Sequence, residues 1–468
     1  MKKFFKVFGI ILLILVVILG VWFLNFYLSH KESFYPKTMI NEVNVSNTTL
    51  DIAQSLIADT VLDKNFIITS NGKELAKLNL EKDLDAKLNF RSELQRIFTD
   101  EKDLSFLDKI QTQKDYTIEL AVDIQQSTIM EALSNFDFMK KENQTTSQDA
   151  YIDFISKETT YKIIPESIGT EVNEEKLYQT IIDKINKEEY TIDLAKEEMY
   201  ILPKVTSTDT SLVKVVDEIN QYLNTKITYN FGDRTEIVDK NIIKNFVNLS
   251  KENIISINED KITEYIDNLA QTYDSVGITR TFKSSKRGDV IISGGDYGYK
   301  IDKDAEFTQL LSEIKEGKII EREPIYSQSG LMRQQDDIGN TYVEVDLSNQ
   351  HIWFYYEGTL IIESDCVTGT NDGVHATPPG VYALKYKERD AVLRGDKKAD
   401  GTYGYESPVS YWMPFNGGIG LHDATWRNNF GGSIYQTSGS HGCVNLPFDT
   451  AATIYERIEK GTPVILYQ

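Results

Sequence analysis

Cysteine is scarce in this chain of 468 residues, which contains only Cys366 and Cys443. Two cysteines cannot provide the disulfide framework that stabilises small secreted domains. Basic residues are also in deficit, because 50 Lys and Arg stand against 71 Asp and Glu. This balance argues against nucleic acid as a partner, since nucleic-acid binding needs a basic surface. The sequence contains no cofactor motif, and we expect no cofactor.

Charged side chains are absent from Val7 to Leu28. These 22 residues span about 33 Å as a helix, enough to cross a bilayer core of about 30 Å. Three lysines precede the run, and the positive-inside rule then keeps the N-terminus in the cytoplasm. A cleavable signal peptide would have a shorter apolar region ending in small residues. We therefore expect residues 1–30 to form a cytoplasmic stub and a single uncleaved transmembrane anchor, with the remaining chain outside the cell.

The length of the chain exceeds what one hydrophobic core usually supports, so we expect three folded units after the anchor. Polar stretches at residues 204–211 and 327–337 mark the joints between these units. The first two units are residues 35–205 and 211–335, called here the first and second modules. The third unit, residues 338–468, is called the C-terminal domain.

The two modules repeat one pattern. Helical spacing at residues 50–57 precedes a strand-like segment and turn at 66–72, and the same order recurs at 215–223 and 226–232. The closing parts of the two modules also correspond, because each ends in an apolar segment followed by a helical pattern. This duplication predicts two related α+β modules rather than one large domain.

The C-terminal domain has the sequence pattern of a mainly-β fold. Apolar and polar residues alternate at 342–347 and 352–356, as in strands, and Glu357-Gly358 suits a hairpin turn into the next strand. Only one clear helical pattern occurs, from residue 448 to 460, and a final strand follows it. The sequence therefore predicts a β domain of about 130 residues, within the usual size range of one domain.

The segment from Ser438 to Pro447, read as SGSHGCVNLP, carries the strongest chemical signal. It places Cys443 beside His441 and two glycines, and a second histidine, His422, precedes Ser440 by seventeen intervening residues. A nucleophilic cysteine needs a base, because a free thiol has a pKa of roughly 8.5. It also needs backbone N–H groups for an oxyanion, and glycine allows the close approach. This pattern predicts a cysteine nucleophile at position 443.

Three other readings of Cys443 stay open from the residues alone. In the first, Cys443 is an inert buried thiol, as we expect for Cys366, which lies in an alternating apolar run. In the second, Cys443 binds zinc with His441 and His422; the paired spacing of secure metal motifs is missing, so we expect no metal. In the third, Cys443 forms a disulfide with Cys366, which would disable the nucleophile. The nucleophile is the favoured reading.

The spacing of His422 and the SHGCVN motif resembles the signature of the L,D-transpeptidases, cysteine enzymes that cross-link peptidoglycan. The resemblance covers roughly residues 338–468 and implies a β-sandwich catalytic domain without a cofactor. The two modules resemble the peptidoglycan-binding modules that precede some of these domains. The alternative for the modules is a spacer that lifts the catalytic domain off the membrane.

The resemblance also implies the role of each motif residue. Cys443 would attack the third residue of a tetrapeptide stem, a diamino acid, and release D-alanine; the thioester would then form a 3→3 cross-link with a neighbouring stem. His422 matches the base, and His441 the histidine that orients the site. Backbone N–H groups around Gly442 and Cys443 are the candidates for the oxyanion hole.

Five further residues are predicted to contact the substrate or to shape its site, namely Ser440, Asn445, Asp423, Tyr405 and Trp412. Asn445 would bond a stem-peptide amide, and the Asp423 carboxylate either orients His422 or belongs to a turn. The loop 394–406, rich in glycine and tyrosine, suits a lid over the substrate groove, with Tyr403, Tyr405 and Trp412 as wall residues. A plain surface loop is the alternative.

The sequence leads to a membrane-anchored L,D-transpeptidase of cell-wall biogenesis, with peptidoglycan stem peptides as donor and acceptor and a cell-wall location outside the membrane. Two rivals remain. An L,D-carboxypeptidase would hydrolyse the same thioester, and a wall-binding protein would hold an inert catalytic domain. Acylation by a carbapenem, which is known for this family, separates the enzymes from the inert protein.

Overall fold

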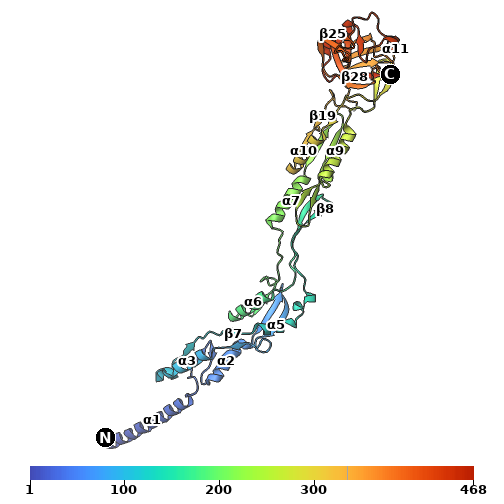
Figure 1. Ribbon diagram of the computed structural model, residues 1–468. Helices are drawn as coiled ribbons and strands as arrows, with labels where there is room; N and C mark the ends of the chain where they lie inside the picture. Colours follow the sequence, from blue (N-terminus) through green and yellow to red (C-terminus); the bar gives the residue numbers. More distant parts are fainter. Residues whose placement is uncertain (335) are drawn as a thin grey trace. The chain divides into compact units, whose positions relative to one another are not determined.

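The computed structural model describes residues 1–334 and 336–468 (Figure 1). By their internal contacts, these residues form two compact units. Unit 1 consists of residues 1–151 and 164–209, and unit 2 of residues 152–163 and 210–468.

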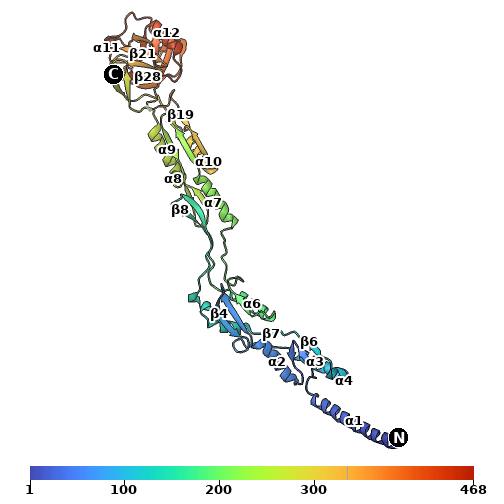
Figure 2. The same cartoon turned by 180° about the vertical axis from the view of Figure 1, so that it is seen from behind.

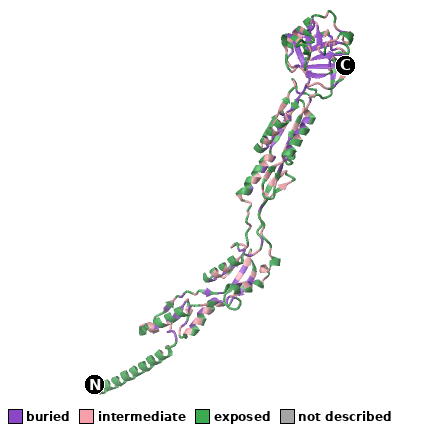
Figure 3. Cartoon of the chain, in the orientation of Figure 1, coloured by how far each residue is buried: buried purple, intermediate pink, exposed green. Residues whose placement is uncertain are grey.

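Unit 1 begins with α1 (Lys2–Ser29), a helix long and apolar enough to cross a membrane. No side chain of α1 is fully buried, and Figure 3 shows most of the helix exposed. Phe26, near the end of the helix, is half-buried. This assignment rests on the length and composition of the helix alone, and an N-terminal signal sequence can have the same length and composition. The predicted apolar helix is therefore present, and its role as an anchor stays a prediction.

The rest of unit 1 combines short helices with small sheets. Its helices are α2 (Leu50–Leu62), α3 (Arg91–Lys102), α4 (Phe106–Ile110), α5 (Gln126–Ser134) and α6 (Glu174–Asn186). Its strands are β1 (Thr38–Ile40), β2 (Val43–Asn44), β3 (Asn65–Ser70), β4 (Lys73–Asn79), β5 (Lys87–Leu88), β6 (Lys114–Tyr116), β7 (Val122–Asp123) and β10 (Thr191–Asp193). Helix α6 shows why these segments are helical: Asn173 caps its first turn, and Leu177, Ile181 and Ile185 recur every four residues on its buried face.

The second module lies in unit 2 and follows a similar plan. Its helices are α7 (Thr210–Leu223), α8 (Lys240–Ile243), α9 (Glu259–Tyr273) and α10 (Lys303–Glu316). Its strands are β11 (Lys226–Asn230), β12 (Thr235–Val238), β13 (Val247–Leu249), β14 (Ile255–Ile257), β15 (Arg280–Ser284), β16 (Gly288–Ile292), β17 (Lys300–Ile301), β18 (Ile319–Arg322) and β19 (Tyr326–Gln328). The sheet order β12-β11-β18 matches β4-β3-β10 of unit 1, and in both sheets the third strand is parallel to the central one and follows a helix. The same arrangement of elements thus occurs twice in the chain.

Each module contains one β-hairpin that packs on the next folded part of the chain and not on the sheet of its own module. Strands β8 (Tyr151–Ile155) and β9 (Thr160–Ile164) lie in the first module by number, but Phe154 and Tyr161 pack against the core of the second module. Asn220 of α7 bonds the backbone of Tyr161 in both directions. The β15–β16 hairpin in turn places Phe282 and Ile292 on the C-terminal domain. Each hairpin therefore packs on the folded part that follows its module.

The second module buries an ionic cluster. Arg322 bonds Glu306 at 2.6 Å and Glu313 at 2.9 Å, and both carboxylates are at most 1% exposed. The hydroxyl of Tyr229 also donates a hydrogen bond to Glu306. Because both acids lie on α10 and Arg322 on β18, the cluster joins helix and sheet, and loss of the arginine would leave two buried charges without a cation.

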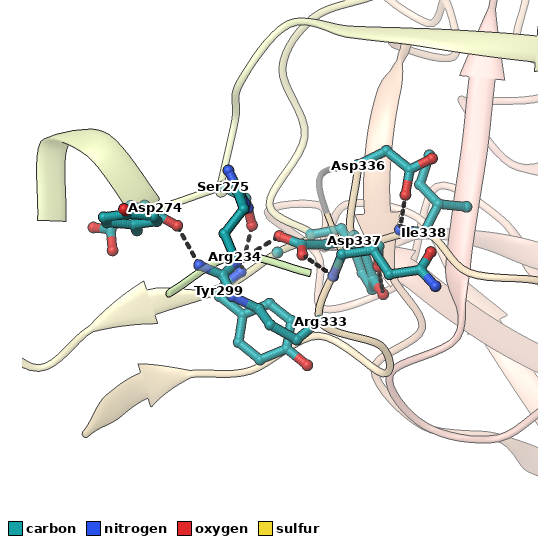
Figure 4. Close-up of polar contacts among 12 residues, drawn as sticks. Arg234, Asp274, Ser275, Tyr299, Arg333, Asp336, Asp337 and Ile338 are labelled. Carbon is teal, nitrogen blue, oxygen red and sulfur yellow. Dashed lines mark hydrogen bonds and ion pairs between the residues drawn. The ribbon is translucent and has the colours of Figure 1, made fainter. Parts of the chain in front are cut away.

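The segment before the C-terminal domain is held by a second ionic cluster, drawn in Figure 4. Arg333 bonds Asp337 at 2.8 Å, with both side chains buried, and its guanidinium lies 4.5 Å from the ring centre of Tyr299. It also donates to the carbonyl of Tyr273 at the end of α9. The polar joint predicted at 327–337 is therefore fixed to the second module by its described residues.

The C-terminal domain contains a five-stranded sheet, β22-β21-β20-β28-β23, and a four-stranded sheet, β24-β25-β26-β27 (Figure 2). The strands are β20 (Tyr342–Asp346), β21 (His351–Tyr356), β22 (Thr359–Asp365), β23 (Gly380–Ala383), β24 (Glu388–Arg394), β25 (Glu406–Asn416), β26 (Ile419–Asp423), β27 (Val444–Leu446) and β28 (Pro463–Tyr467). The helices are α11 (Ile434–Ser438) and α12 (Phe448–Arg457). Apolar residues of both sheets and α12 share one core. The hairpin turn predicted at Glu357-Gly358 is confirmed between β21 and β22.

Candidate active site

The four-stranded sheet brings the motif residues together. Strand β26 is parallel to β27, and His422 pairs with Asn445 in the ladder. Cys443 lies directly before β27, two residues from Asn445, so alternation along the strand places their side chains on one face. His422 shares this face through its pairing, and all three residues line one pocket. Most of the residues between His422 and Ser440 thus belong to the connection between the adjacent strands β26 and β27.

The turn from Ser440 to Cys443 is fixed by its own hydrogen bonds. The Ser440 hydroxyl donates to the carbonyl of Cys443 at 2.6 Å and accepts from the N–H of Gly442 at 3.1 Å. Gly442 has φ of +117°, a conformation that favours glycine, and a Cβ there would meet Ile419 at 3.0 Å. Ser440, predicted to contact the substrate, therefore uses its hydroxyl to shape the turn, and the N–H of Gly442 is occupied in this structure.

Cys443 is a free, partly buried thiol that packs against Ala391, Val409 and Trp412. Its sulfur lies 3.6 Å from the carbonyl oxygen of Gly418, to which the thiol donates. Burial raises the pKa of Cys443 to about 11, although a hydrogen bond from the Gly420 backbone acts in the opposite direction. The Cys443 thiol is therefore neutral at pH 7.

His422 is 3% exposed and has its ring orientation fixed by the backbone. Its Nδ1 lies 2.8 Å from the carbonyl oxygen of Asp423. Because a carbonyl oxygen only accepts, Nδ1 must carry the proton, which leaves Nε2 as the unprotonated nitrogen of the neutral ring. Burial lowers the pKa of His422, so the imidazole is neutral at pH 7 and able to accept a proton.

The carboxylate of Asp423 does not hold the imidazole. It accepts a hydrogen bond from the N–H of Tyr411 at 2.8 Å. Successive side chains of a strand point to opposite faces, so Asp423 faces away from the site when His422 faces into it. The predicted orienting role belongs to the carbonyl of Asp423 instead.

His441 is exposed and belongs to a row of rings. It stacks on Tyr405, with ring centres 4.9 Å apart, and meets His375 edge-on at 4.7 Å. Asp372 bonds Nδ1 of His375 at 2.6 Å. Asp372 and His375 come from the loop between β22 and β23. The gathering of four of the five histidines in the last quarter of the sequence includes His375, whereas no pattern pointed to Asp372. His441 thus lies at the rim of the site, between that loop and Tyr405.

Asn445 is 2% exposed, and its Oδ1 is buried with no hydrogen-bond partner among the described residues. Its backbone pairs with Val367 in both directions, which fixes the residue in the sheet. A buried acceptor without a partner is costly, so this oxygen is suited to an N–H donor that arrives with a ligand. The contact of Asn445 with a stem-peptide amide stays a prediction.

The pocket around these residues has a volume of about 230 Å³. Its lining consists of Leu393, Tyr405, Ser407, His422, Trp426, Arg427, Gly439, Ser440, His441, Cys443 and Asn445. Trp426 and Arg427 follow His422 by four and five residues and were not predicted from the sequence. The ring of Trp426 lies 5.9 Å from that of His422, and Arg427 donates to the carbonyls of Ser438 and Gly439.

The three aromatic residues predicted for the wall occupy different places. Tyr403 is exposed, lies against the guanidinium of Arg394 and is not part of the pocket lining. Tyr405 lines the pocket near the start of β25, at the end of the predicted lid loop. Trp412 is 6% exposed, pairs with His422 in the ladder and packs under Cys443. Trp412 therefore supports the site from within the sheet and is not part of the pocket lining.

The state of the two cysteines bears on the inert, disulfide and zinc readings of Cys443. Both cysteines are free, and Cys366 is fully buried in the core of the C-terminal domain, where burial raises the pKa of its thiol. Within residues 1–334 and 336–468, no group of three or more His, Cys, Asp and Glu residues is arranged to hold a metal.

Comparison with protein families places two kinds of domain in the chain. Residues 340–466 match the family described as "L,D-transpeptidase catalytic domain". Residues 80–193 and 205–320 each match the family "Putative peptidoglycan binding domain". Among curated proteins, none matches the chain.

Solved structures include several similar proteins. The crystal structure of a Cys→Ser mutant of Enterococcus faecium L,D-transpeptidase is 34% identical over 54% of this chain and 100% of that one, with a TM-score of 0.47. The solution structure of an E. faecium L,D-transpeptidase catalytic domain is 46% identical, over 27% of this chain and 97% of that one, with a TM-score of 0.25. The same domain acylated by ertapenem is 45% identical over 28% and 98%, also with a TM-score of 0.25. The family matches and the identity over an entire relative agree, and the chain therefore belongs to the L,D-transpeptidase family.

Proposed function

We propose that this protein is a membrane-anchored L,D-transpeptidase that forms 3→3 cross-links through a thioester on Cys443. The observation that carries the proposal is the arrangement of Cys443 and His422, a lone thiol and a neutral imidazole on one face of paired strands. The carbonyl of Asp423 holds the proton on Nδ1, so Nε2 is the nitrogen left to accept the thiol proton. Related support comes from the E. faecium domain that was solved with ertapenem attached.

The acylation step uses Cys443 as the nucleophile and His422 first as a base and then as an acid. The sulfur of Cys443 attacks the carbonyl carbon of the third stem residue while its proton moves to Nε2 of His422. The tetrahedral intermediate then expels the amine of D-alanine, which takes the proton from His422 as the C–N bond breaks. This leaves a neutral base and a thioester, and it needs no cofactor.

The transfer step runs the same groups in reverse. The side-chain amine of an acceptor stem attacks the thioester carbon and loses a proton to His422. The new C–N bond forms, the C–S bond breaks, and the sulfur recovers the proton from His422. Asn445 Oδ1 would accept from an amide N–H of the stem, because that oxygen is buried without a partner among the described residues.

The surroundings of the catalytic domain suit a wall enzyme. Helix α1 would hold the chain in the membrane, and the remainder would face the peptidoglycan outside. The two matches to a peptidoglycan-binding family support wall binding by residues 80–193 and 205–320.

One experiment separates transfer from hydrolysis. Purified protein is incubated with tetrapeptide stems and the products are weighed by mass spectrometry. A cross-linked dimer with loss of D-alanine supports the proposal, whereas a tripeptide alone makes the protein an L,D-carboxypeptidase. Cys443→Ala is the matched control, and Cys366→Ala should behave as the unaltered protein. Products that persist in Cys443→Ala would overturn the proposed mechanism.

Wall binding is tested separately by sedimentation with purified sacculi. The full chain is compared with a fragment beginning at Ser329, which retains every proposed catalytic residue. Weaker sedimentation of the fragment, with acylation by a carbapenem preserved, supports binding by the modules. Equal sedimentation of the two proteins leaves the modules as spacers.

A further inference from the structure

Helix α4 (Phe106–Ile110) carries two exposed apolar side chains that no part of the proposed reaction uses. Phe106 is 38% exposed and Leu107 is 63% exposed. They follow Ser105, whose hydroxyl caps the helix by accepting from the N–H of Asp108. The first turn of α4 thus presents an apolar pair at its tip, next to polar residues on both sides.

This tip lies against the end of α1. The ring of Phe106 is 4.9 Å from that of Phe23, and its centre is 6.0 Å from the centres of both Trp22 and Phe26. Figure 2 shows α4 at the same side of unit 1 as α1. Rings from one end of the apolar helix and from the folded part of unit 1 therefore form one aromatic cluster.

Polar contacts fix the end of α1 on unit 1 as well. The ammonium of Lys102 donates to the carbonyls of His30 at 2.8 Å and Ser33 at 2.7 Å, just after the helix ends. The imidazole of His30 bonds the side chain of Asn47 at 2.8 Å. Tyr35, which is buried, stacks on Phe26 with ring centres 5.8 Å apart. The end of α1 is thus joined to the rest of unit 1 by ring packing and by hydrogen bonds.

The depth of Phe106 follows from the geometry of α1. Phe23 precedes Leu28, the last residue of the uncharged run, by five positions, or about 7.5 Å along a helix. Apolar faces of interfacial helices lie about 5–10 Å into the boundary between headgroups and acyl chains. A ring in contact with Phe23 therefore falls at this depth when α1 spans the bilayer. Aromatic residues are also those that favour the membrane interface.

We propose that Phe106 and Leu107 insert into the outer surface of the lipid bilayer and seat unit 1 directly on the membrane. The inference rests on the anchoring role given to α1 in the proposed function. Unit 1 then contacts the membrane at a second point, the tip of α4 beside α1, and is not connected to the membrane through α1 alone. The occupant of this surface is lipid, since the apolar tip continues the surface of the membrane helix itself.

The test measures contact with lipid by fluorescence quenching in the full chain. The protein is placed in bilayers whose acyl chains carry bromine near the headgroup. Trp22→Phe removes the tryptophan of α1, and Leu107→Trp in that background introduces one at the proposed contact. The matched control is Ile168→Trp in the same background, because Ile168 is also in unit 1 and 61% exposed. The fluorescence of the remaining native tryptophans is measured in the Trp22→Phe protein and subtracted from that of each variant.

We expect the indole introduced by Leu107→Trp to be quenched about as strongly as native Trp22, and the indole at the control position to stay unquenched. Quenching of Trp22 without quenching at position 107 would overturn the docking surface and leave the anchor intact. Absence of quenching at both positions would overturn the anchor too. A signal at position 107 that depends on protein density and not on bromine would assign the surface to a second copy and overturn the proposal.

Two measurements keep the result interpretable. Phe106→Trp repeats the test one residue away, so a misfolded single variant cannot decide the outcome. Carbapenem acylation of each variant at Cys443 reports whether the C-terminal domain is folded and reactive. Loss of quenching with normal acylation therefore counts against lipid docking alone, while loss of acylation in the unaltered chain counts against the proposed catalytic function.

Discussion

Replacing His422 by alanine should make acylation of Cys443 depend on hydroxide. Burial lowers the pKa of His422 and raises the pKa of Cys443 to about 11, so both groups are neutral at pH 7. Without the imidazole, only the thiolate reacts, and a thiol of pKa near 11 is ionised to roughly 1 part in 10⁴ at pH 7. General bases contribute about 10²–10⁴ in rate. We expect His422→Ala to lose acylation rate at pH 7 within that range.

The pH profile provides the sharper measurement. The thiolate fraction in His422→Ala rises about tenfold per pH unit until the pH reaches the thiol pKa, so its rate should climb about tenfold per unit between pH 7 and 10. In the unaltered enzyme the imidazole must be neutral, and its pKa is below its usual range, so the rate falls only in acid and is flat above pH 7. Single-turnover acylation by a carbapenem, followed by intact mass, gives both profiles.

His441→Ala is the control for this experiment. Because His441 is exposed and stacks on Tyr405, its loss should reduce the rate by a factor that pH does not restore. A His422→Ala profile that stays parallel to the unaltered enzyme would refute the general-base role. A tenfold rise per pH unit in His441→Ala instead would reassign the base to His441.

Three further predictions concern the turn, the rim and the second module. Gly442→Ala should reduce acylation by at least about tenfold, because φ of +117° and the nearby Ile419 side chain oppose a methyl group. Gly404→Ala is the control and should react normally, because a Cβ at Gly404 meets no atom nearer than 3.6 Å. Equal acylation rates in the two variants would show that the turn tolerates a Cβ at position 442. Tyr405→Ala should slow acylation and Tyr405→Phe should spare it, since stacking on His441 needs only the ring; equal loss in both would assign the role to the hydroxyl. Arg322→Met should lower the free energy of unfolding of the second module by about 3–5 kcal/mol, measured by urea denaturation, because two buried carboxylates lose their cation. An unchanged midpoint would show that the ionic cluster does not stabilise the second module.

The catalytic motif was accessible from the sequence because its chemistry is local. Cys443, His441 and Gly442 lie within three consecutive residues, and the spacing to His422 singles out the second histidine. Family membership, the strands of the C-terminal domain and the apolar first helix followed in the same way. These features depend on residue type and short-range pattern, which a sequence displays directly.

What the sequence did not reveal depends on register and on distant packing. Trp412 and His422 are opposite each other only because β25 and β26 pair, and the pairing register cannot be read from either strand alone. The role of Asp423 was recoverable in part, since its neighbour in a strand must face the other way. Asp372 and His375 reach the rim through a loop whose path no periodicity records.

The two hairpins illustrate the same limit at the level of domains. The pattern of the first module includes residues 152–163, but their apolar side chains pack on the second module. Burial of Phe154 and Tyr161 could be expected from their type, whereas the surface that covers them is set by tertiary structure. Domain boundaries drawn along the sequence miss such exchanges because they assume that each segment packs on its neighbours in the chain.

The central claim is that Cys443 is the nucleophile and that Cys366 is inert. It is tested most directly by exposing the full chain to a carbapenem and mapping the adduct by peptide mass spectrometry. The account predicts one adduct per chain, on the peptide that contains Cys443, and none in Cys443→Ser. An adduct on Cys366, or an undiminished adduct in Cys443→Ser, would contradict it.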